Sequence, residues 1–323
     1  MKHFWLTALL AALVLLAVPV ALTSGTAPAG STPDESAAAV TDDGTIAVFR
    51  SAEAATETVD TFEYVCGSVA AEMPLTYRDE ALKAQAVACR TNALRLKAAG
   101  GTDGADITDD STVHQGYLGR DERRQKWGDA YEQYEKKLEA AVKATGSEVL
   151  TSGGELCVAA FSAVSSGVTE SAEVAWGGAV PYLVSVQSPG DPLAPAYLST
   201  VLFTREQFAA AAATLGAELP DGADLKTALT VQKTSDAGTV TEAALCGKRV
   251  TGEEVRAAFS LASPCFTVSA SDSGVTFRCT GQGHGVGMSQ YGADYMAGEG
   301  KTYKEILAHY YTGAQITKAQ PKT

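Results

Sequence analysis

The apolar run at the N-terminus separates a segment that can enter a membrane from the part of the chain that can fold as a globular domain in water. Lys2 and His3 precede residues 4–22, which are apolar except for Thr7 and Pro19. This length approaches what a helix needs to cross a bilayer and exceeds the usual core of a signal peptide. We therefore expect residues 1–22 to be an uncleaved membrane anchor or signal-anchor. A signal peptide cut near the Ala-Pro-Ala at 27–29 is the alternative.

The composition after this run separates a spacer from a folded body. Residues 23–46 are rich in Ser, Thr, Ala, Pro and Gly, which predicts a flexible linker. The whole chain has 46% hydrophobic and 20% charged residues, as globular proteins do. We expect one domain over residues 47–318, held outside the cytoplasm at the cell membrane by the single anchor. The net charge of −13 argues against nucleic acid as a partner.

Hydrophobic periodicity predicts a mixed α/β (α+β) fold for the body. Residues 61–73 have a helical period that ends at Pro74, and a second helix opens with a capping box of Thr76 and Asp79 and stops at Gly100. Residues 101–126 are polar and turn-rich. Further helices are expected at 128–145, 204–215, 252–259, 288–297 and from 302 onward, with a hairpin over 148–163 and short strands between 229 and 279.

Glu72 is the unusual residue of the first helix. It follows Val65 and Val69 along the apolar stripe and lies at the C-terminal end, where the helix dipole is negative. Burial and the dipole both disfavour the ionised carboxylate, so the pKa should rise, as a general acid requires. The alternative from the pattern alone is a glutamate that points into solvent.

The segment GQGHGVGMSQYGADYMAG, residues 281–298, places His284 among alternating glycines. Its spacing meets neither nucleotide-binding fingerprint, and a zinc site would need ligands beyond Cys279 and His284. A Cys–His peptidase is poorly constrained, because any of the six cysteines could be the nucleophile. We expect those cysteines to be small buried hydrophobes rather than disulfides. A carbohydrate site fits better, with a glycine-rich turn around a satisfied histidine as the alternative.

Four segments in the same order resemble the stage II sporulation protein D family, which also includes the amidase enhancer LytB. They are YVCGSVAAEMP (64–74), EALKAQAVACRTNAL (80–94), VAWGGAVPYLVSVQSP (174–189) and GQGHGVGMSQYGADYMAGEGKTYKEILAHYYTG (281–313). The resemblance implies a membrane-anchored lytic transglycosylase. Such an enzyme cleaves the MurNAc–GlcNAc bond of peptidoglycan glycan strands and leaves 1,6-anhydro-MurNAc ends.

The resemblance also implies site residues. Glu72 matches the catalytic acid and Arg90 a functionally needed arginine, while His284, Ser289, Gln290 and Tyr291 fall in the signature that lines the cleft. This chain has Phe161-Ser162 where many members have an aromatic residue and a histidine, and Asn92 where a tyrosine is usual. Some clostridial relatives bind zinc nearby, but the missing histidine argues against zinc here, so we expect no cofactor.

The resemblance implies partners as well as substrate. Sporulation members act on glycan strands stripped of stem peptides, during engulfment, beside a cell-wall amidase and a membrane-anchored scaffold protein. The alternative function is a non-catalytic wall-binding module that enhances an N-acetylmuramoyl-L-alanine amidase. Only the enzyme needs Glu72.

Overall fold

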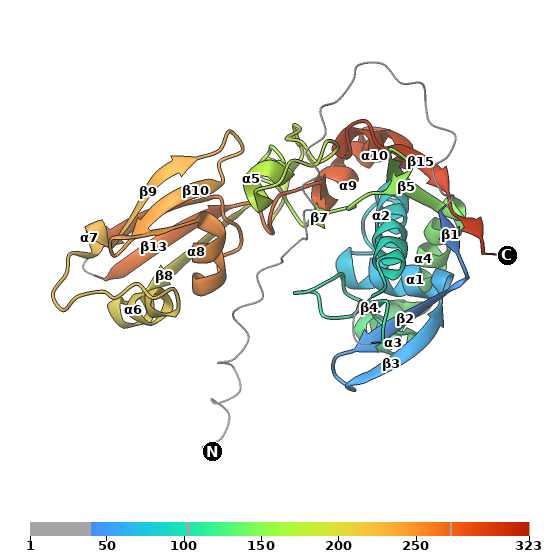
Figure 1. Ribbon diagram of the computed structural model, residues 1–323, viewed down its shortest axis with the longest axis horizontal. Helices are drawn as coiled ribbons and strands as arrows, with labels where there is room; N and C mark the ends of the chain where they lie inside the picture. The colour runs from blue at the N-terminus through green and yellow to red at the C-terminus, as the bar shows by residue number, and fades with distance from the viewer. Residues whose placement is uncertain (1–39, 102–103, 272, 323) are drawn as a thin grey trace. The chain divides into compact units, whose positions relative to one another are not determined.

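The computed structural model describes residues 40–101, 104–271 and 273–322 (Figure 1). The predicted anchor and most of the predicted linker lie outside these residues. In the described part of the chain, no helix is long and apolar enough to cross a membrane. The last residues of the predicted linker are already ordered in strands, since β1 covers Thr41–Asp42 and β2 begins at Thr45.

Two separate hydrophobic cores organise the described residues. We call the first the helical core; it takes its members from residues 46–183 and again from 286–319. The second, the β-rich core, lies between these stretches in sequence, from Phe208 to Cys279. The sequence predicted a single domain and the mixed α/β class, and the mixture of helices and sheets is confirmed. The division into two cores was not foreseen.

Helices α1 (Thr61–Glu72) and α2 (Asp79–Ala98) form the centre of the helical core (Figure 1). The Asp60 carboxylate caps α1 by accepting from the amides of Phe62 and Glu63. The predicted capping box of α2 is wrong, because its N-cap is Arg78 and makes no side-chain cap. Thr76 instead belongs to the corner between the helices, where Pro74 prevents the first helix from continuing.

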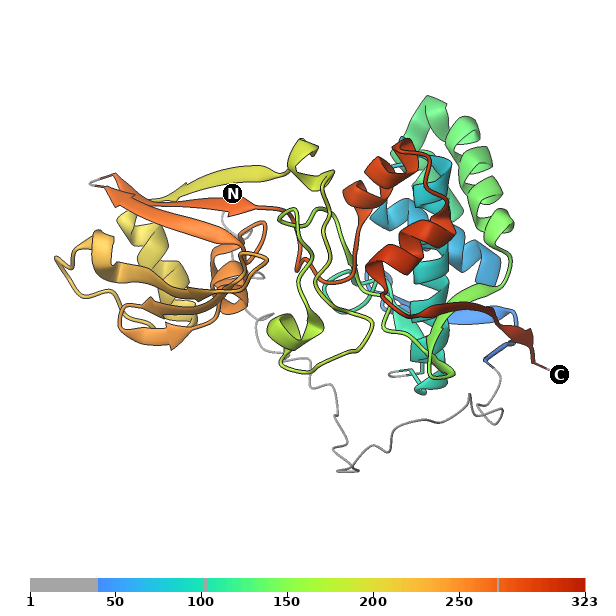
Figure 2. The same cartoon turned by 90° about the horizontal axis from the view of Figure 1, so that it is seen from above.

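Helices from both halves of the chain pack around α2. Helix α4 (Tyr131–Thr145) confirms the predicted amphipathic helix, and α3 (Arg120–Trp127) is a helix where a loop was expected. Figure 2 shows the C-terminal helices α9 and α10, in red, beside α2. Helix α10 confirms the helix predicted from residue 302 onward, and it begins with a capping box of Thr302 and Glu305. Their bounds are α9 Gln290–Gly298 and α10 Tyr303–Tyr310.

Short sheets border the helical core. Strand β2 (Thr45–Arg50) pairs with β3 (Ala55–Asp60) and with β4 (Ile107–Thr108). The hairpin predicted over 148–163 is confirmed as β5 (Glu148–Ser152) and β6 (Glu155–Leu156), but its second strand is shorter than predicted, since residues 157–160 form no strand. Strand β15 (Gln315–Lys318) pairs with the other edge of β5. Two-residue pairs join β7 (Phe161–Ser162) to β14 (Met288–Ser289), and β1 to β16 (Gln320–Pro321).

The β-rich core is built from two three-stranded antiparallel sheets and short helices. One sheet has the order β12-β13-β8 and the other β11-β10-β9. Phe259 and Phe277 lie at the centre of a cluster of phenylalanine rings. The bounds are β8 Leu198–Phe203, α6 Arg205–Thr214, α7 Leu225–Ala228, β9 Leu229–Thr234, β10 Val240–Leu245, β11 Lys248–Val250, α8 Gly252–Phe259, β12 Phe266–Ser271 and β13 Gly274–Thr280.

Candidate active site

Glu72 is the last residue of α1, and its carboxylate is held by a backbone amide from a different part of the chain. The Gly116 N–H donates to Glu72 Oε1 at 2.5 Å. A Cβ on residue 116 would lie 2.9 Å from the Ala71 Cβ and 3.2 Å from Glu72 Oε1, so only glycine fits without displacement. The amide fixes one carboxylate oxygen.

The pKa of Glu72 is raised, as its position on the apolar stripe predicted. Burial of the carboxylate is the main cause, opposed by the Gly116 amide and by the positive charge of Lys126. Burial disfavours the charged form, whereas the amide and the ammonium favour it. A partly buried carboxyl group with a raised pKa can be protonated at the start of a reaction and can then accept a proton.

The segment that carries Gly116 docks onto α1 by close packing. A Cβ at Gly67 would lie 2.3 Å from the Tyr117 ring, so the glycine in α1 makes room for that side chain. The Tyr117 ring stacks on Tyr64 with centroids 5.4 Å apart, and the Leu118 amide donates to the Gly67 carbonyl. The position of the Gly116 amide therefore depends on α1 itself.

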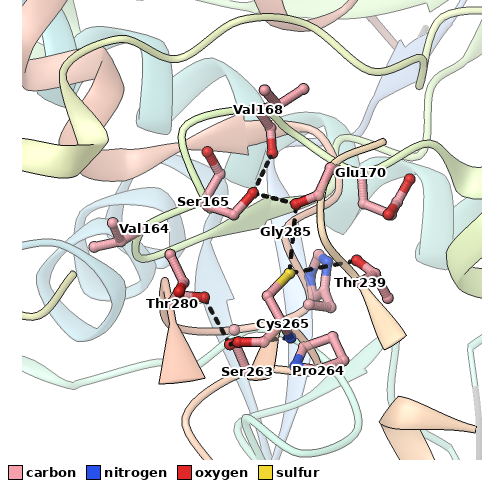
Figure 3. Close-up of a pocket in the computed structure, with 14 residues that line it drawn as sticks. Val164, Ser165, Val168, Glu170, Thr239, Ser263, Pro264, Cys265, Thr280 and Gly285 are labelled. Atoms are coloured by element: carbon pink, nitrogen blue, oxygen red, sulfur yellow. Dashed lines mark hydrogen bonds between the residues drawn. The ribbon is translucent and has the colours of Figure 1, made fainter. Parts of the chain in front are cut away.

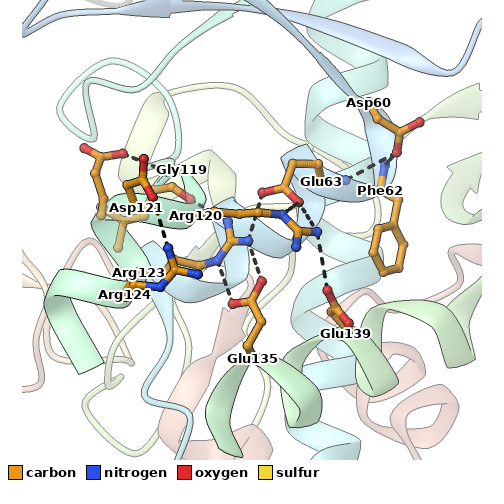
Figure 4. A network of polar contacts seen from close by, with 12 residues as sticks. Asp60, Phe62, Glu63, Gly119, Arg120, Asp121, Arg123, Arg124, Glu135 and Glu139 are labelled. Carbon is orange, nitrogen blue, oxygen red and sulfur yellow. Dashed lines mark hydrogen bonds and ion pairs between the residues drawn. The ribbon is translucent and has the colours of Figure 1, made fainter. Parts of the chain in front are cut away.

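A buried ion-pair network fixes the other end of this segment (Figure 4). The Arg123 side chain on α3 has no exposed surface and bonds both oxygens of Glu135 on α4, at 2.9 and 2.7 Å. It also bonds Glu63 on α1 at 2.8 Å and the Leu118 carbonyl at 2.8 Å. Arg123 thus joins α1, α3 and α4 to the chain two residues after Gly116.

A buried polar network lies behind the Gly116 segment. The Gln115 side-chain amide donates to the Tyr64 hydroxyl at 3.0 Å and to the Cys89 carbonyl at 2.9 Å. Asn92 donates to the Gln115 side chain and exchanges two hydrogen bonds with the backbone of Ala159. Asn92 therefore connects the Gln115–Gly116 segment to the irregular stretch before β7.

The corner after Glu72 meets the helix that follows the glycine-rich stretch. The Arg78 guanidinium pairs with Asp294 on α9 at 2.6 Å, and the Arg78 amide donates to the same carboxylate. The Tyr77 ring stands edge-on to Tyr291, with centroids 6.2 Å apart. The structure thus brings Tyr291 next to the corner that begins immediately after Glu72.

The glycines around His284 are explained by the protein's own backbone. Gly281, Gly283, Gly285 and Gly287 all have positive φ, between 75° and 102°, which favours glycine. A Cβ at Gly281, Gly283 or Gly287 would lie within 3 Å of residues 160–165. Gly285 differs, because the nearest atom to a built Cβ is 3.8 Å away. Three of the four glycines therefore serve close packing against residues 160–165.

His284 is held as a neutral imidazole. Its Nδ1 accepts a hydrogen bond from the Val286 amide at 3.0 Å, which places the proton on Nε2. Burial lowers its pKa to about 4, with the charge of Arg256 acting in the same direction and the Phe161 backbone opposing it. The Trp176 ring packs against it at 5.8 Å between centroids.

The cavity beside His284 is very small (Figure 3). Its volume is about 10 Å³, which is roughly enough for one water molecule. Glu170, Thr239 and Cys265 contribute polar groups to its wall. Glu170 is buried and accepts from the Ser171 amide and the Ser235 hydroxyl. A sugar ring cannot enter this cavity.

Ser289 and Gln290 of the signature are buried. The Ser289 hydroxyl donates to Asp191 at 2.7 Å and accepts from the Gly292 amide, so it caps α9. The Gln290 side chain donates to Gln85 on α2 at 3.4 Å. Tyr291 is partly exposed, and its hydroxyl donates to the Leu193 carbonyl at 3.2 Å.

Asp191 is a central residue that the sequence reasoning missed. It is fully buried and accepts from the Ser165 amide and hydroxyl as well as from Ser289. Burial raises its pKa, and these donors oppose the change. In the sequence, Asp191 was marked only by its place between Gly190 and Pro192, just after residues 174–189, which resemble the family. Asp191 connects the Ser165 loop to the start of α9.

Arg90 makes no hydrogen bond or ion pair with Glu72 among the described residues. Its guanidinium is buried and donates to Thr145 Oγ1 at the end of α4 and to the Glu148 carbonyl of β5, both at 3.2 Å. Arg90 thus connects α2 with α4 and β5. Because these hydrogen bonds do not involve Glu72, we expect Arg90 to have no direct effect on the Glu72 carboxyl group.

The described residues hold no group of three or more His, Cys, Asp or Glu side chains placed to bind a metal ion. All six cysteines are free, and Cys66, Cys89, Cys157 and Cys279 are buried, as expected from their apolar surroundings. Burial raises the pKa of Cys265 in the small cavity, so its thiol is a poor nucleophile.

Comparisons with known proteins identify the family of this chain. A family model described as a stage II sporulation protein matches residues 5–152. Stage II sporulation protein D of Bacillus subtilis (strain 168) is 39% identical over 277 residues, 85% of this chain and 79% of that protein. The Bacillus amyloliquefaciens protein of that name is 38% identical with the same coverage.

A more distant relative is an amidase enhancer. The amidase enhancer of Bacillus subtilis (strain 168) is 28% identical over 299 aligned residues, 78% of this chain and 40% of that protein. The class defined by these matches is that of sporulation proteins related to the cell wall. This chain belongs to the stage II sporulation protein D family, as the sequence resemblance predicted.

Proposed function

We propose that this protein is a peptidoglycan lytic transglycosylase in which Glu72 is the single acid–base residue. The observation that carries the proposal is the Glu72 carboxyl group, partly buried, with a raised pKa and one oxygen fixed by the Gly116 amide. Its substrate is the β-1,4-linked MurNAc–GlcNAc strand, stripped of stem peptides, during sporulation and engulfment. Family membership supports the cell-wall role.

One carboxyl group is sufficient for this reaction because the substrate supplies its own nucleophile. The protonated Glu72 gives its proton to the glycosidic oxygen while the bond from that oxygen to C1 of MurNAc breaks. The resulting carboxylate takes the proton of the MurNAc 6-hydroxyl, and O6 bonds to C1. The product has a 1,6-anhydro ring, and Glu72 is protonated again. Most glycoside hydrolases use a second carboxylate, either to activate water or as the nucleophile.

The surroundings of Glu72 suit both halves of this cycle. Burial favours the protonated carboxyl group that the first step needs, and the Gly116 amide and Lys126 favour the carboxylate that the second step needs. The glycan strand would follow the partly exposed residues His284 and Tyr291. The buried residues of the predicted site would act by holding the surrounding elements in place; these are Ser289, Gln290 and Arg90.

No cofactor enters the proposed reaction. The single anchor would keep the domain at the membrane, beside an amidase and a scaffold protein.

Similarity to an amidase enhancer keeps a second function open. In that case the protein binds the wall and stimulates an N-acetylmuramoyl-L-alanine amidase without cleaving glycan. Both functions use the glycan-binding surface, but only the first needs the proton of Glu72.

The variant Glu72→Gln separates the two functions. The amide keeps the size of the side chain but cannot donate and recover a proton, so cleavage of denuded glycan should fall by about 10²–10⁴-fold or more. Folding and strand binding should persist, as measured by melting temperature and cosedimentation with denuded glycan. Glu72→Asp should also be poor, because its carboxyl group is drawn back by one methylene. Full cleavage by Glu72→Gln would contradict the proposal.

A further inference from the structure

A half-exposed tryptophan lies at the edge of the glycine-rich signature. Trp176 is 46% exposed, which is high for the largest apolar side chain. It ends the short helix α5 (Ala172–Trp176), and the exposed side chains of Val174 and Val184 are close to it in sequence. A large aromatic side chain left exposed beside a site is a candidate contact for a ligand or a partner.

The backbone around Trp176 is fixed on both sides. The Ser171 hydroxyl caps α5 through the Val174 amide, and Gly177 ends the helix in the left-handed conformation, with φ of 76°. The Ala172 amide donates to the Leu183 carbonyl at 2.9 Å. The backbone that carries the Trp176 indole is therefore fixed at both ends of α5, although this helix is short.

The same support also fixes the imidazole against which the indole packs. The Glu170 amide donates to the Gly285 carbonyl at 2.9 Å, next to His284, and the Glu170 carboxylate accepts from the Ser171 amide at the start of α5. The ring centroids of Trp176 and His284 are 5.8 Å apart, with an interplanar angle of 53°. His284 thus packs against one side of the indole, while nearly half of the surface of Trp176 stays open to solvent.

The chemistry of this surface suits a neutral ring with an apolar face. His284 is neutral because its Nδ1 accepts from the Val286 amide. A Cβ built at Gly177 or Gly178 meets nothing within 4 Å, so the space after the tryptophan is open. One tryptophan and two valines are far fewer than the roughly 20–30 residues that each side of a stable protein interface contributes. A pyranose ring, whose axial C–H groups form an apolar face, matches this size and polarity.

We infer that Trp176, supported by His284, is a stacking platform for one sugar ring of a peptidoglycan glycan strand. The inference rests on the proposed function and adds a binding subsite to it. Trp176 binds the strand at a position away from the bond that breaks, and His284 acts as a positioning residue for the indole.

Binding of denuded glycan strands to the full-length chain tests the platform. Trp176→Ala should raise the Kd about tenfold, which corresponds to ~1.4 kcal/mol, and Trp176→Phe should recover part of the affinity. Leu202→Ala, at a side chain 50% exposed on β8, is the matched control and should bind like the wild type. Melting temperatures should be unchanged in all three variants.

Fluorescence gives a second readout that a merely structural role would not change. The chain has three tryptophans, Trp5, Trp127 and Trp176. Glycan strands should shift the emission of the wild type and of Trp127→Phe but not that of Trp176→Phe.

Wild-type affinity of Trp176→Ala would overturn the platform, and the anhydro products of the wild type would still support the proposed function. A wild type that neither binds nor cleaves denuded glycan would overturn both. Loss of amidase stimulation alone in Trp176→Ala would assign the surface to a protein and overturn the sugar platform.

Discussion

At the scale of residues, Glu72 shows how far a pattern can predict chemistry. Its position on an apolar stripe, three residues after Val69, was sufficient to predict a raised pKa, because burial depends on the helical period. The Gly116 amide could not be predicted, since it comes from a segment 44 residues away that was expected to be an irregular loop. The glycines around His284 were interpreted as part of a carbohydrate site, but three of them pack closely against residues 160–165 of the chain itself.

Lys126 should set the alkaline limit of activity. Its charge favours the ionised form of Glu72, so Lys126→Gln should raise the pKa of Glu72 further. The first step needs the protonated acid, and kcat/KM falls as the pH rises through this pKa. The alkaline limb of the pH profile should therefore move to higher pH. Lys136→Gln, on the exposed side of α4, is the control. An unmoved limb, or an equal shift in the control, would exclude this role of Lys126.

At the scale of elements, local signals predicted most helices but missed those whose stability comes from contacts. Helices α1, α4, α6, α8, α9 and α10 followed from periodicity and caps. Helix α3 is highly polar, and its fully buried Arg123 is stabilised by Glu63 and Glu135, partners that periodicity cannot show. The predicted cap of α2 failed because Thr76 is used in the corner that docks onto α9 through Arg78.

Breaking the Arg123 network should be costly. Arg123→Met leaves Glu135, and in part Glu63, without a buried partner, so the free energy of unfolding should fall by about 3–5 kcal/mol. Arg124→Met is the matched control; its side chain is exposed and should change the free energy by less than about 0.5 kcal/mol. Urea unfolding followed by circular dichroism measures both. Equal effects of the two substitutions would show that the network does not stabilise α3.

At the scale of the whole molecule, the sequence predicted the family and the mixed fold class but not the second core. Residues 198–280 form their own sheets and a cluster of phenylalanine rings. In sequence they lie between the two stretches that build the helical core. Short strands with local turns give no signal of which core they join, because that depends on contacts distant in sequence. The segment predicted to be a membrane anchor lies outside the described residues, so the anchor stays a prediction.

The end groups of the product test the central claim most directly. Purified denuded glycan strands are incubated with the wild-type chain, and the fragments are analysed by mass spectrometry. If Glu72 is the single acid–base residue of a lytic transglycosylase, the new ends are 1,6-anhydro-MurNAc, without added water, and Glu72→Gln produces none. Ordinary reducing MurNAc ends from the wild type would contradict the account, because water instead of the MurNAc 6-hydroxyl would then have attacked C1.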